Sequence, residues 1–193
     1  LPYARSLSTA ASARSQKLQS YALLMYFIYS LFSAAAMLLL APYFLIQGLR
    51  RGKYLESLSQ RFGSLPPEVV TPENEARPVI WMHAVSVGEA LAAVPLARQL
   101  KQRYPGRRLV VSTTTVTGQR LARERLDFAD AIFYFPFDWA WTVRETFRAI
   151  RPGVIIILET EIWPNFLREA RRSGVPVVFV NGRISERSFR GYR

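Results

Sequence analysis

Residues 154–165 read VIIILETEIWPN, a run of aliphatic side chains that ends in two acids. Five aliphatic residues in succession, Val154 to Leu158, are typical of a strand that is buried on both faces, as in a parallel sheet. Glu159 and Glu161 follow at once, and because unpaired charges are expensive to bury, the strand must end where they begin. Pro164 suits the first turn of a helix. The stretch therefore predicts a strand, an acidic turn and a helix, and it leaves open whether the acids only face water or perform chemistry.

Four more segments of the same kind lie between Pro78 and the end of the chain. Apolar runs that predict strands cover residues 79–85, 108–115, 131–137 and 175–181, and helical segments separate them. Strands that alternate with helices in this way form βαβ units around a parallel sheet. We therefore predict an α/β fold, a Rossmann-like parallel sheet flanked by helices, over residues 78–193. Such sheets bind ligands beyond the carboxyl ends of their strands, so the turns after the strands are the places to search.

The N-terminal part of the chain has a different character. No charged residue occurs between Lys17 and Arg50, and within this span residues 21–47 are long and apolar enough to cross a bilayer as a transmembrane anchor helix. A cleaved signal peptide would have a shorter apolar region, and a buried core helix would have a polar stripe. Residues 1–20 are predicted to be a disordered leader. Residues 48–77 are interpreted as a juxtamembrane amphipathic segment and linker.

Charge is unevenly distributed along the chain. The formal net charge is +12, but residues 1–53 carry six basic and no acidic side chains, residues 54–165 thirteen and twelve, and residues 166–193 seven and two. A nucleic-acid-binding domain concentrates basic side chains on the folded face that contacts phosphate. The excess beside the apolar segment instead indicates membrane lipids as partners, and no nucleic acid is expected. Basic residues flank that segment on both sides, so they do not define its orientation.

The composition excludes several kinds of site. The chain contains no Cys, which rules out disulfides, thiolate chemistry and Cys-based zinc sites, and a single His rules out a metal site built from several histidines. We expect this residue, His83, to be packed or hydrogen-bonded near the end of its strand. The turn after the first strand does not match G-x-G-x-x-G, so a dinucleotide bound in the usual way is not expected. No metal ion and no cofactor are predicted.

Polar residues occupy the turns after the first two predicted strands. Ser86 and Glu89 have the spacing of a capping box, in which each side chain satisfies a backbone N–H at the start of a helix. The alternative is that Glu89 acts as a general base on the ligand-binding edge, and spacing alone favours the capping box. The loop with Thr115 and Thr117 leads into a helix near Gly118, where a phosphate or sugar could bind. Ordinary strand residues followed by a helix cap explain this loop equally well.

The third and fourth turns contain acids. Asp138 is predicted to cap the helix that follows it. Glu159 and Glu161 need water or basic partners, and their closeness should raise the pKa of one of them. Together with Glu89 they could supply a base and a group that orients an acceptor hydroxyl. Alternatively, one acid is solvated and the other pairs with an arginine such as Arg183.

The motifs of these turns, in this order and at this spacing, resemble those of the 3-deoxy-D-manno-octulosonic acid (Kdo) transferases of Gram-negative bacteria, which build the inner core of lipopolysaccharide. The segments that carry the resemblance are WMHAVSVGEALAAVPLARQL (residues 81–100), STTTVTGQRLA (112–122), FPFD (135–138) and LETEIWPNFLREARRSGVPVVFVNGRIS (158–185). The resemblance runs from the apolar segment to the end of the chain. It implies the N-terminal, acceptor-binding domain of a glycosyltransferase with two Rossmann domains (the GT-B fold).

The resemblance also implies an activity and roles for individual residues. Such enzymes transfer Kdo from CMP-Kdo to a glucosamine hydroxyl of a lipid A precursor, with inversion and without a metal. The family's proton acceptor falls on Glu89, and its second essential acid falls on Glu159. Candidate substrate-binding residues are Ser86, Gly88, Thr115, Thr117, Glu161 and Arg183. Because the family continues with a second domain that holds most of the CMP-Kdo site, the C-terminal donor domain is expected to be missing here and the fragment to be inactive alone.

The substrates implied by the resemblance indicate a location. A lipid-linked acceptor is met at a membrane surface and CMP-sugars are cytoplasmic, so we expect a single-pass anchor in the bacterial inner membrane with the catalytic domain facing the cytoplasm. Two alternatives stay open. One is a different GT-B enzyme that acts on nucleotide sugars, and the other is a non-catalytic, membrane-tethered binding module.

Overall fold

The computed structural model of the chain describes residues 24–39, 42, 54–72, 78–159 and 161–181. The chain divides into two compact units, Leu1–Arg51 and Gly52–Arg193. In the first unit, residues 24–39 form a helix. Across the described residues, no helix combines the length and the apolarity that a membrane crossing needs. The predicted leader lies outside the described residues, and so do residues 21–23, 40–41 and 43–47 of the predicted transmembrane helix. Both stay predictions.

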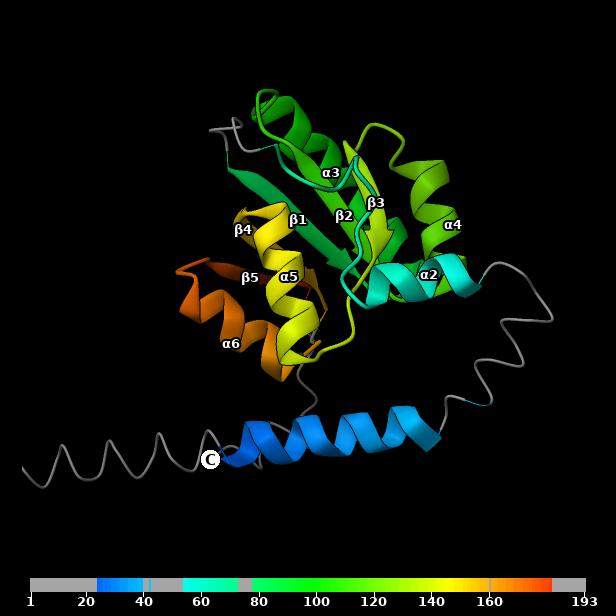
Figure 1. Cartoon of the computed structure of the whole chain (residues 1–193). Helices are drawn as coiled ribbons and strands as arrows, with labels where there is room; N and C mark the ends of the chain where they lie inside the picture. Colours follow the sequence, from blue (N-terminus) through cyan, green and yellow to red (C-terminus); the bar gives the residue numbers. More distant parts are fainter. Residues whose placement is uncertain (1–23, 40–41, 43–53, 73–77, 160, 182–193) are drawn as a thin grey trace, which may run out of the picture. The chain divides into compact units, whose positions relative to one another are not determined.

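A single parallel sheet of five strands forms the centre of the second unit (Figure 1). The strands are β1 (Val79–Ala84), β2 (Leu109–Thr113), β3 (Ala131–Tyr134), β4 (Pro152–Leu158) and β5 (Val177–Val180). Their order across the sheet is β3-β2-β1-β4-β5, and every neighbouring pair is parallel. The predicted α/β fold with a parallel sheet is confirmed.

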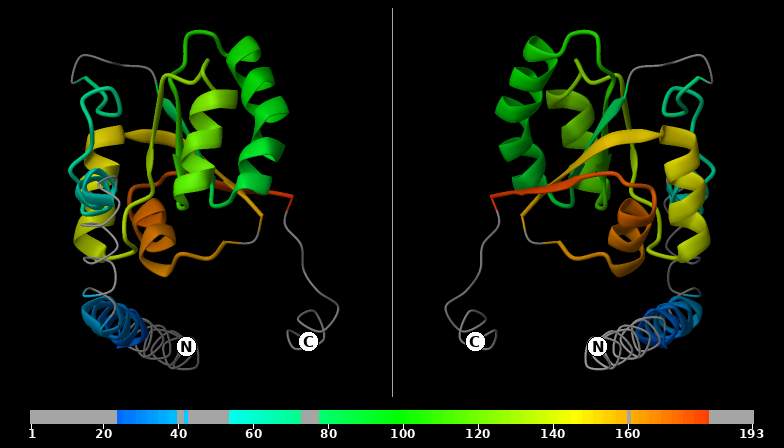
Figure 2. Two further views of the ribbon diagram at one scale, coloured as in Figure 1. Left: turned by 90° about the vertical axis from the view of Figure 1, so that its right-hand side faces the viewer. Right: turned by 90° about the vertical axis from the view of Figure 1, so that its left-hand side faces the viewer.

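Helices cover both faces of this sheet (Figure 2). Helices α3 (Val87–Arg103) and α4 (Val116–Arg125) lie on one face, and α5 (Ala140–Ile150) and α6 (Pro164–Arg172) lie on the other. Successive side chains of a strand point to opposite faces. In β1, Trp81 therefore packs in the cluster beneath α5 and α6, whereas Met82 packs in the cluster beneath α3 and α4. Two covered faces explain why β1, β2 and β4 are buried at most or all positions and are mostly apolar, not apolar at every second position only.

The segment before the sheet belongs to the same unit. Helix α2 (Tyr54–Arg61) contacts β3, and the buried side chain of Gln60 accepts a hydrogen bond from the backbone N–H of Tyr134 at 2.9 Å. The guanidinium of Arg61 donates to the carbonyl of Thr114, just beyond β2. The described part of the predicted juxtamembrane segment thus uses polar side chains to pack on the sheet. Helix α2 therefore lies in the same compact unit as the sheet.

Candidate active site

The connections of the sheet reverse direction between β1 and β4, which lie side by side. From β1 the chain continues to β2 and β3 on one side, and from β4 it continues to β5 on the other. In sheets of this kind ligands bind in the crevice beyond the carboxyl ends of the strands at which the order reverses. The turn after β1 contains Ser86, Gly88 and Glu89, and the turn after β4 contains Glu159 and Glu161. The topology therefore brings the predicted acids to one edge of the sheet.

Glu89 is held in one orientation by two hydrogen bonds. Its carboxylate accepts from the backbone N–H of Val85 at 2.7 Å and from the hydroxyl of Ser86 at 2.7 Å. The Ser86 hydroxyl in turn accepts from the N–H of Glu89 at 3.4 Å and caps α3. The side chain is buried, with 6% of its surface exposed. The predicted capping box is confirmed, except that Glu89 reaches the N–H of Val85 and not that of Ser86.

Hydrogen bonds join the turn after β1 to the turn after β2. The carbonyl of Val85 accepts hydrogen bonds from the N–H groups of Thr114 and Thr115, at 3.4 and 3.2 Å. The hydroxyl of Thr115 caps α4 by accepting from the N–H of Gly118 at 3.0 Å. A Cβ on Gly118 would lie 2.7 Å from that hydroxyl and 3.4 Å from the carbonyl oxygen of Val85, so only glycine fits without displacing the turn. The backbone that orients Glu89 is therefore braced by the neighbouring turn.

Glu159 occupies an unusual backbone conformation at the end of β4. Its φ is +66°, in the left-handed region that residues with a side chain seldom adopt. The backbone is held there because the N–H of Glu159 donates to the carbonyl of Val180 in β5 at 2.8 Å. Strain of this kind persists only when the surroundings impose it, and it is concentrated at functional sites. The strand pattern predicted where β4 ends, but not this conformation.

Glu161 lies close enough to the other two acids to be affected by their charge. Burial raises the pKa of Glu161 above its ordinary value, and the negative charges of Glu89 and Glu159 raise it further. Glu89 follows β1, and Glu159 and Glu161 follow β4, so all three side chains lie at the carboxyl end of the sheet, and we call them the acidic cluster. The prediction that a pKa in the acid pair would be raised is confirmed for Glu161.

Replacing Glu159 by Gly should stabilise the domain by roughly 0.5–1 kcal/mol, because glycine adopts positive φ without steric cost. Urea denaturation followed by circular dichroism measures the change. The matched control is Asn181→Gly, at φ +59° beyond β5, where Asn tolerates the left-handed region and the gain should be smaller. A loss of stability in Glu159→Gly would mean that the side chain makes contacts that outweigh the strain.

His83 has a structural role. Its ring is fully buried, stacks on Phe135 with the ring centroids 3.9 Å apart, and places Nδ1 3.0 Å from the hydroxyl of Ser112. Burial lowers the pKa of His83 to about 3, so the ring is neutral. The expectation of a packed, hydrogen-bonded histidine is confirmed. Across the described residues no group of three or more His, Asp or Glu side chains is placed to hold a metal ion.

Asp138 does not cap the helix that follows it, so that prediction is wrong. The N-cap of α5 is Trp139, which makes no side-chain capping bond. The carboxylate of Asp138 instead accepts hydrogen bonds from the N–H groups of Asn165 and Phe166, at the start of α6. The sequence predicted a cap for α5 because an N-cap residue normally lies immediately before the helix that it caps. The sequence does indicate that α6 needs a cap from elsewhere, because Trp163 and Pro164 at its start have no side chain that can accept a backbone N–H.

The remaining predicted site residues are Thr117, Gly88 and Arg183. Thr117 lines a cavity of about 540 Å³ beside α4, together with Tyr134 and Arg120. Gly88 lies in the first turn of α3. Arg183 lies outside the described residues, so its pairing with an acid stays a prediction. The substrate-binding role proposed for each of these residues also stays a prediction.

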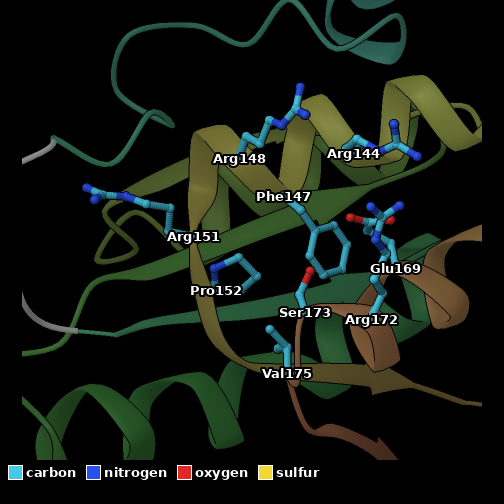
Figure 3. Close-up of a pocket in the computed structure, with 9 residues that line it drawn as sticks. All are labelled: Arg144, Phe147, Arg148, Arg151, Pro152, Glu169, Arg172, Ser173 and Val175. Carbon is cyan, nitrogen blue, oxygen red and sulfur yellow. The ribbon is translucent and has the colours of Figure 1, made fainter.

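A separate basic cavity of about 460 Å³ lies between α5 and α6 (Figure 3). Phe147, Pro152 and Val175 are among its apolar lining residues. Its arginines point in different directions: Arg151 extends away from the others, and Arg148 pairs with Glu145 at 2.5 Å outside the cavity lining. The cavity contains none of the three clustered glutamates, and we do not include it in the candidate active site.

Comparison with known proteins identifies relatives of this chain. The sequence profile of the family described as 3-Deoxy-D-manno-octulosonic-acid transferase (kdotransferase) matches residues 56–193. The 3-deoxy-D-manno-octulosonic acid transferase of Chlamydophila psittaci is 34% identical over 163 residues, which are 84% of this chain and 37% of that protein. The transferase of the same name from Haemophilus influenzae is 35% identical over 147 residues, 72% of this chain and 32% of that protein.

A plant protein is also a relative. A protein of Arabidopsis thaliana described as a probable mitochondrial 3-deoxy-D-manno-octulosonic acid transferase is 32% identical over 144 residues, 73% of this chain and 31% of that protein. The chain thus spans about a third of the length of the curated relatives it matches. The profile match covers most of the chain, including the turns that carry the three glutamates. The chain belongs to the 3-deoxy-D-manno-octulosonic acid transferase family of glycosyltransferases.

Proposed function

We propose that this chain is the acceptor-binding part of a membrane-anchored enzyme that transfers Kdo from CMP-Kdo to a hydroxyl of a lipid A precursor. The observation that carries the proposal is the cluster of Glu89, Glu159 and Glu161 at the reversal point of the sheet, on the turns whose motifs match the family. A fixed carboxylate beside other acids suits proton transfer better than the binding of an anionic sugar nucleotide. The acceptor is therefore the substrate that this half contacts.

In the proposed reaction Glu89 is the general base. As the acceptor oxygen bonds to the anomeric carbon of Kdo, its proton passes to the Glu89 carboxylate. The bond from that carbon to the phosphate of CMP breaks on the opposite face, so the configuration inverts and CMP leaves with the electron pair. The hydrogen bonds from Val85 and Ser86 fix the carboxylate before the acceptor arrives, and positioned bases of this kind contribute about 10²–10⁴-fold to a rate.

Glu159 and Glu161 have supporting roles in this proposal. Glu159 orients the acceptor or stabilises charge in the transition state. Glu161, whose pKa is raised, takes up a proton at a higher pH than an ordinary glutamate. In its neutral form it reduces the repulsion between the acidic cluster and the negatively charged donor. No step in this scheme calls for a metal or a cofactor.

We further propose that residues 21–47 anchor the enzyme in the bacterial inner membrane, with the α/β domain in the cytoplasm. Three properties of the sequence support the anchor: its length, its lack of charge, and the basic residues that flank it. The part of this segment that the structure describes exposes large apolar side chains, among them Phe32 and Leu39. Arginine side chains near the membrane would bind the phosphates of the acceptor through charge-assisted hydrogen bonds.

The function is tested by assaying the complete protein that carries this chain with a lipid A precursor as acceptor. We expect transfer from CMP-Kdo and none from UDP-sugars, because the family resemblance specifies the CMP-linked donor. Transfer from a UDP-sugar would support the alternative of a different GT-B enzyme. Binding of the acceptor without transfer from any donor would support the non-catalytic binding module.

A further inference from the structure

The first turn of α6 has backbone donors that its own side chains do not satisfy. Its N-cap residue, Trp163, makes no side-chain capping bond, and Pro164 has no N–H. The intrahelical bonds begin with the N–H of Leu167, which donates to the carbonyl of Trp163 at 2.9 Å. This leaves the N–H groups of Asn165 and Phe166, both in buried residues. Buried backbone donors are almost always paired, so their partner must come from elsewhere.

Asp138 supplies both missing acceptors from a different loop. One carboxylate oxygen accepts from the N–H of Asn165 at 3.0 Å, and the other accepts from the N–H of Phe166 at 2.8 Å. The side-chain amide of Asn165 donates back to the carbonyl of Asp138 at 2.6 Å. A negative charge at a helix N-terminus is favoured by the helix dipole, and hydrogen bonds to a carboxylate are stronger than neutral ones. A buried carboxylate between β3 and α5 thus fixes the start of α6.

The acidic turn lies directly before this fixed point. At its beginning, the N–H of Glu159 is bonded to the carbonyl of Val180. At its end, Glu161 stands two residues before Trp163, where the backbone enters the helix that Asp138 caps. We propose that Asp138 is a positioning residue of the active site, which holds the acidic turn in place at the carboxyl end of the sheet. This inference rests on the proposed function, because it assigns that turn a part in transfer.

The alternative is that Asp138 only stabilises α6, and the titration of Glu161 separates the two. The pKa of Glu161 is raised by its burial and by Glu89 on α3 and Glu159 at the end of β4. Its value therefore depends first on how far the turn is buried, and then on how near the turn lies to Glu89 and Glu159. If the cap is lost and the turn moves away, the pKa of Glu161 falls toward its ordinary value. A cap that only adds stability would leave this pKa unchanged.

The test is Asp138→Asn in the complete protein. Asn has nearly the same shape, but its amide group turns an N–H toward one of the two backbone donors, so one hydrogen bond of the cap is lost. We expect kcat to fall at least tenfold, because a shift of about 1 Å in a reacting group can cost 10²-fold. The KM for CMP-Kdo should change little. The limb of the pH–rate profile that Glu161 controls should move to lower pH, and carboxyl ¹³C NMR should report a lower pKa for Glu161.

Asp130→Asn is the matched control. The carboxylate of Asp130 accepts a hydrogen bond from the backbone N–H of Leu109 at 2.7 Å and pairs with Lys101, at the opposite edge of the sheet. This variant should lose thermal stability without a change in the pH profile or in the pKa of Glu161. A similar outcome in Asp138→Asn, with stability lowered but kcat, pH profile and Glu161 pKa unchanged, would overturn the positioning role.

The positioning role and the proposed function fail in different ways. If the unaltered complete protein transfers no Kdo, the proposed function is wrong, whatever Asp138 does. The NMR titration of Glu161 needs no substrate, so it still tests whether Asp138 holds the acidic turn. If the unaltered protein is active and Asp138→Asn leaves the pKa of Glu161 where it was, only the positioning role is wrong.

Discussion

Replacing Glu89 by Gln is expected to lower kcat for Kdo transfer by about 10²–10⁴-fold while the fold is retained. The amide cannot accept the proton of the acceptor hydroxyl, so the step assigned to Glu89 is lost. The amide can keep both structural contacts, because its oxygen accepts from the N–H of Val85 and its NH₂ group donates to the hydroxyl of Ser86. Steady-state kinetics and the thermal midpoint of the complete protein measure the two effects separately.

A surface glutamate provides the control for this variant. Glu124 on α4 is exposed and lies 4.0 Å from Arg120, a pair of the kind that contributes little to stability. Glu124→Gln should leave both kcat and the thermal midpoint close to those of the unaltered protein. Near-normal turnover in Glu89→Gln would show that Glu89 is only a helix cap, the interpretation that its spacing from Ser86 also allows.

The largest loss of stability is expected from Trp81→Ala, at about 3–5 kcal/mol in the free energy of unfolding. No part of Trp81 is exposed, and its indole N–H donates to the hydroxyl of Ser112 at 2.8 Å. Four aromatic rings from β3, the loop after it, α5 and α6 surround the indole, with centroids 4.9–6.2 Å away: Phe133, Phe135, Phe147 and Phe166. Truncation would leave a cavity that these rings cannot fill and a buried hydroxyl without its donor.

Trp141→Ala is the matched control for that loss. Trp141 lies at the start of α5, is 52% exposed, and stacks on Phe62 with the ring centroids 6.1 Å apart. Because most of this ring already faces water, its removal should cost about 1 kcal/mol or less. Urea denaturation followed by far-ultraviolet circular dichroism compares the two variants. Equal losses would contradict the assignment of Trp81 to the centre of the core.

The sheet could be predicted from the sequence because its signal is local. Each strand is a short run of mostly apolar residues. The run from Val154 to Leu158, for example, can be predicted as a strand from its own residues alone. The placement of Glu89, Glu159 and Glu161 at one end of the sheet also followed, because the carboxyl ends of parallel strands share one edge. In both cases the prediction needed only the positions of the strands in the sequence and the general rule that parallel strands end at the same edge of the sheet.

The features that could not be predicted depend on contacts between distant segments. Asp138 looks like an ordinary cap for α5, and nothing near it in the sequence points to Asn165, which lies 27 residues away. The packing of α2 could not be predicted either. Gln60 bonds to the backbone N–H of Tyr134, and almost every residue has such a group, so the sequence does not identify this partner. The left-handed conformation of Glu159 is imposed by β5, so it is equally invisible in the residues around it.

The cap of α6 has a consequence for how the chain folds during synthesis. A helix of nine residues is too short to be stable alone in water, so α6 depends on its contacts from the moment it forms. Asp138 leaves the ribosome before α6 does, because it precedes Pro164 in the chain. The acceptor for the first turn of α6 is therefore already present when that turn is made. Asp138, which supports the end of the acidic turn, is thus synthesised before the turn, whereas Val180, which supports its beginning, is synthesised after it.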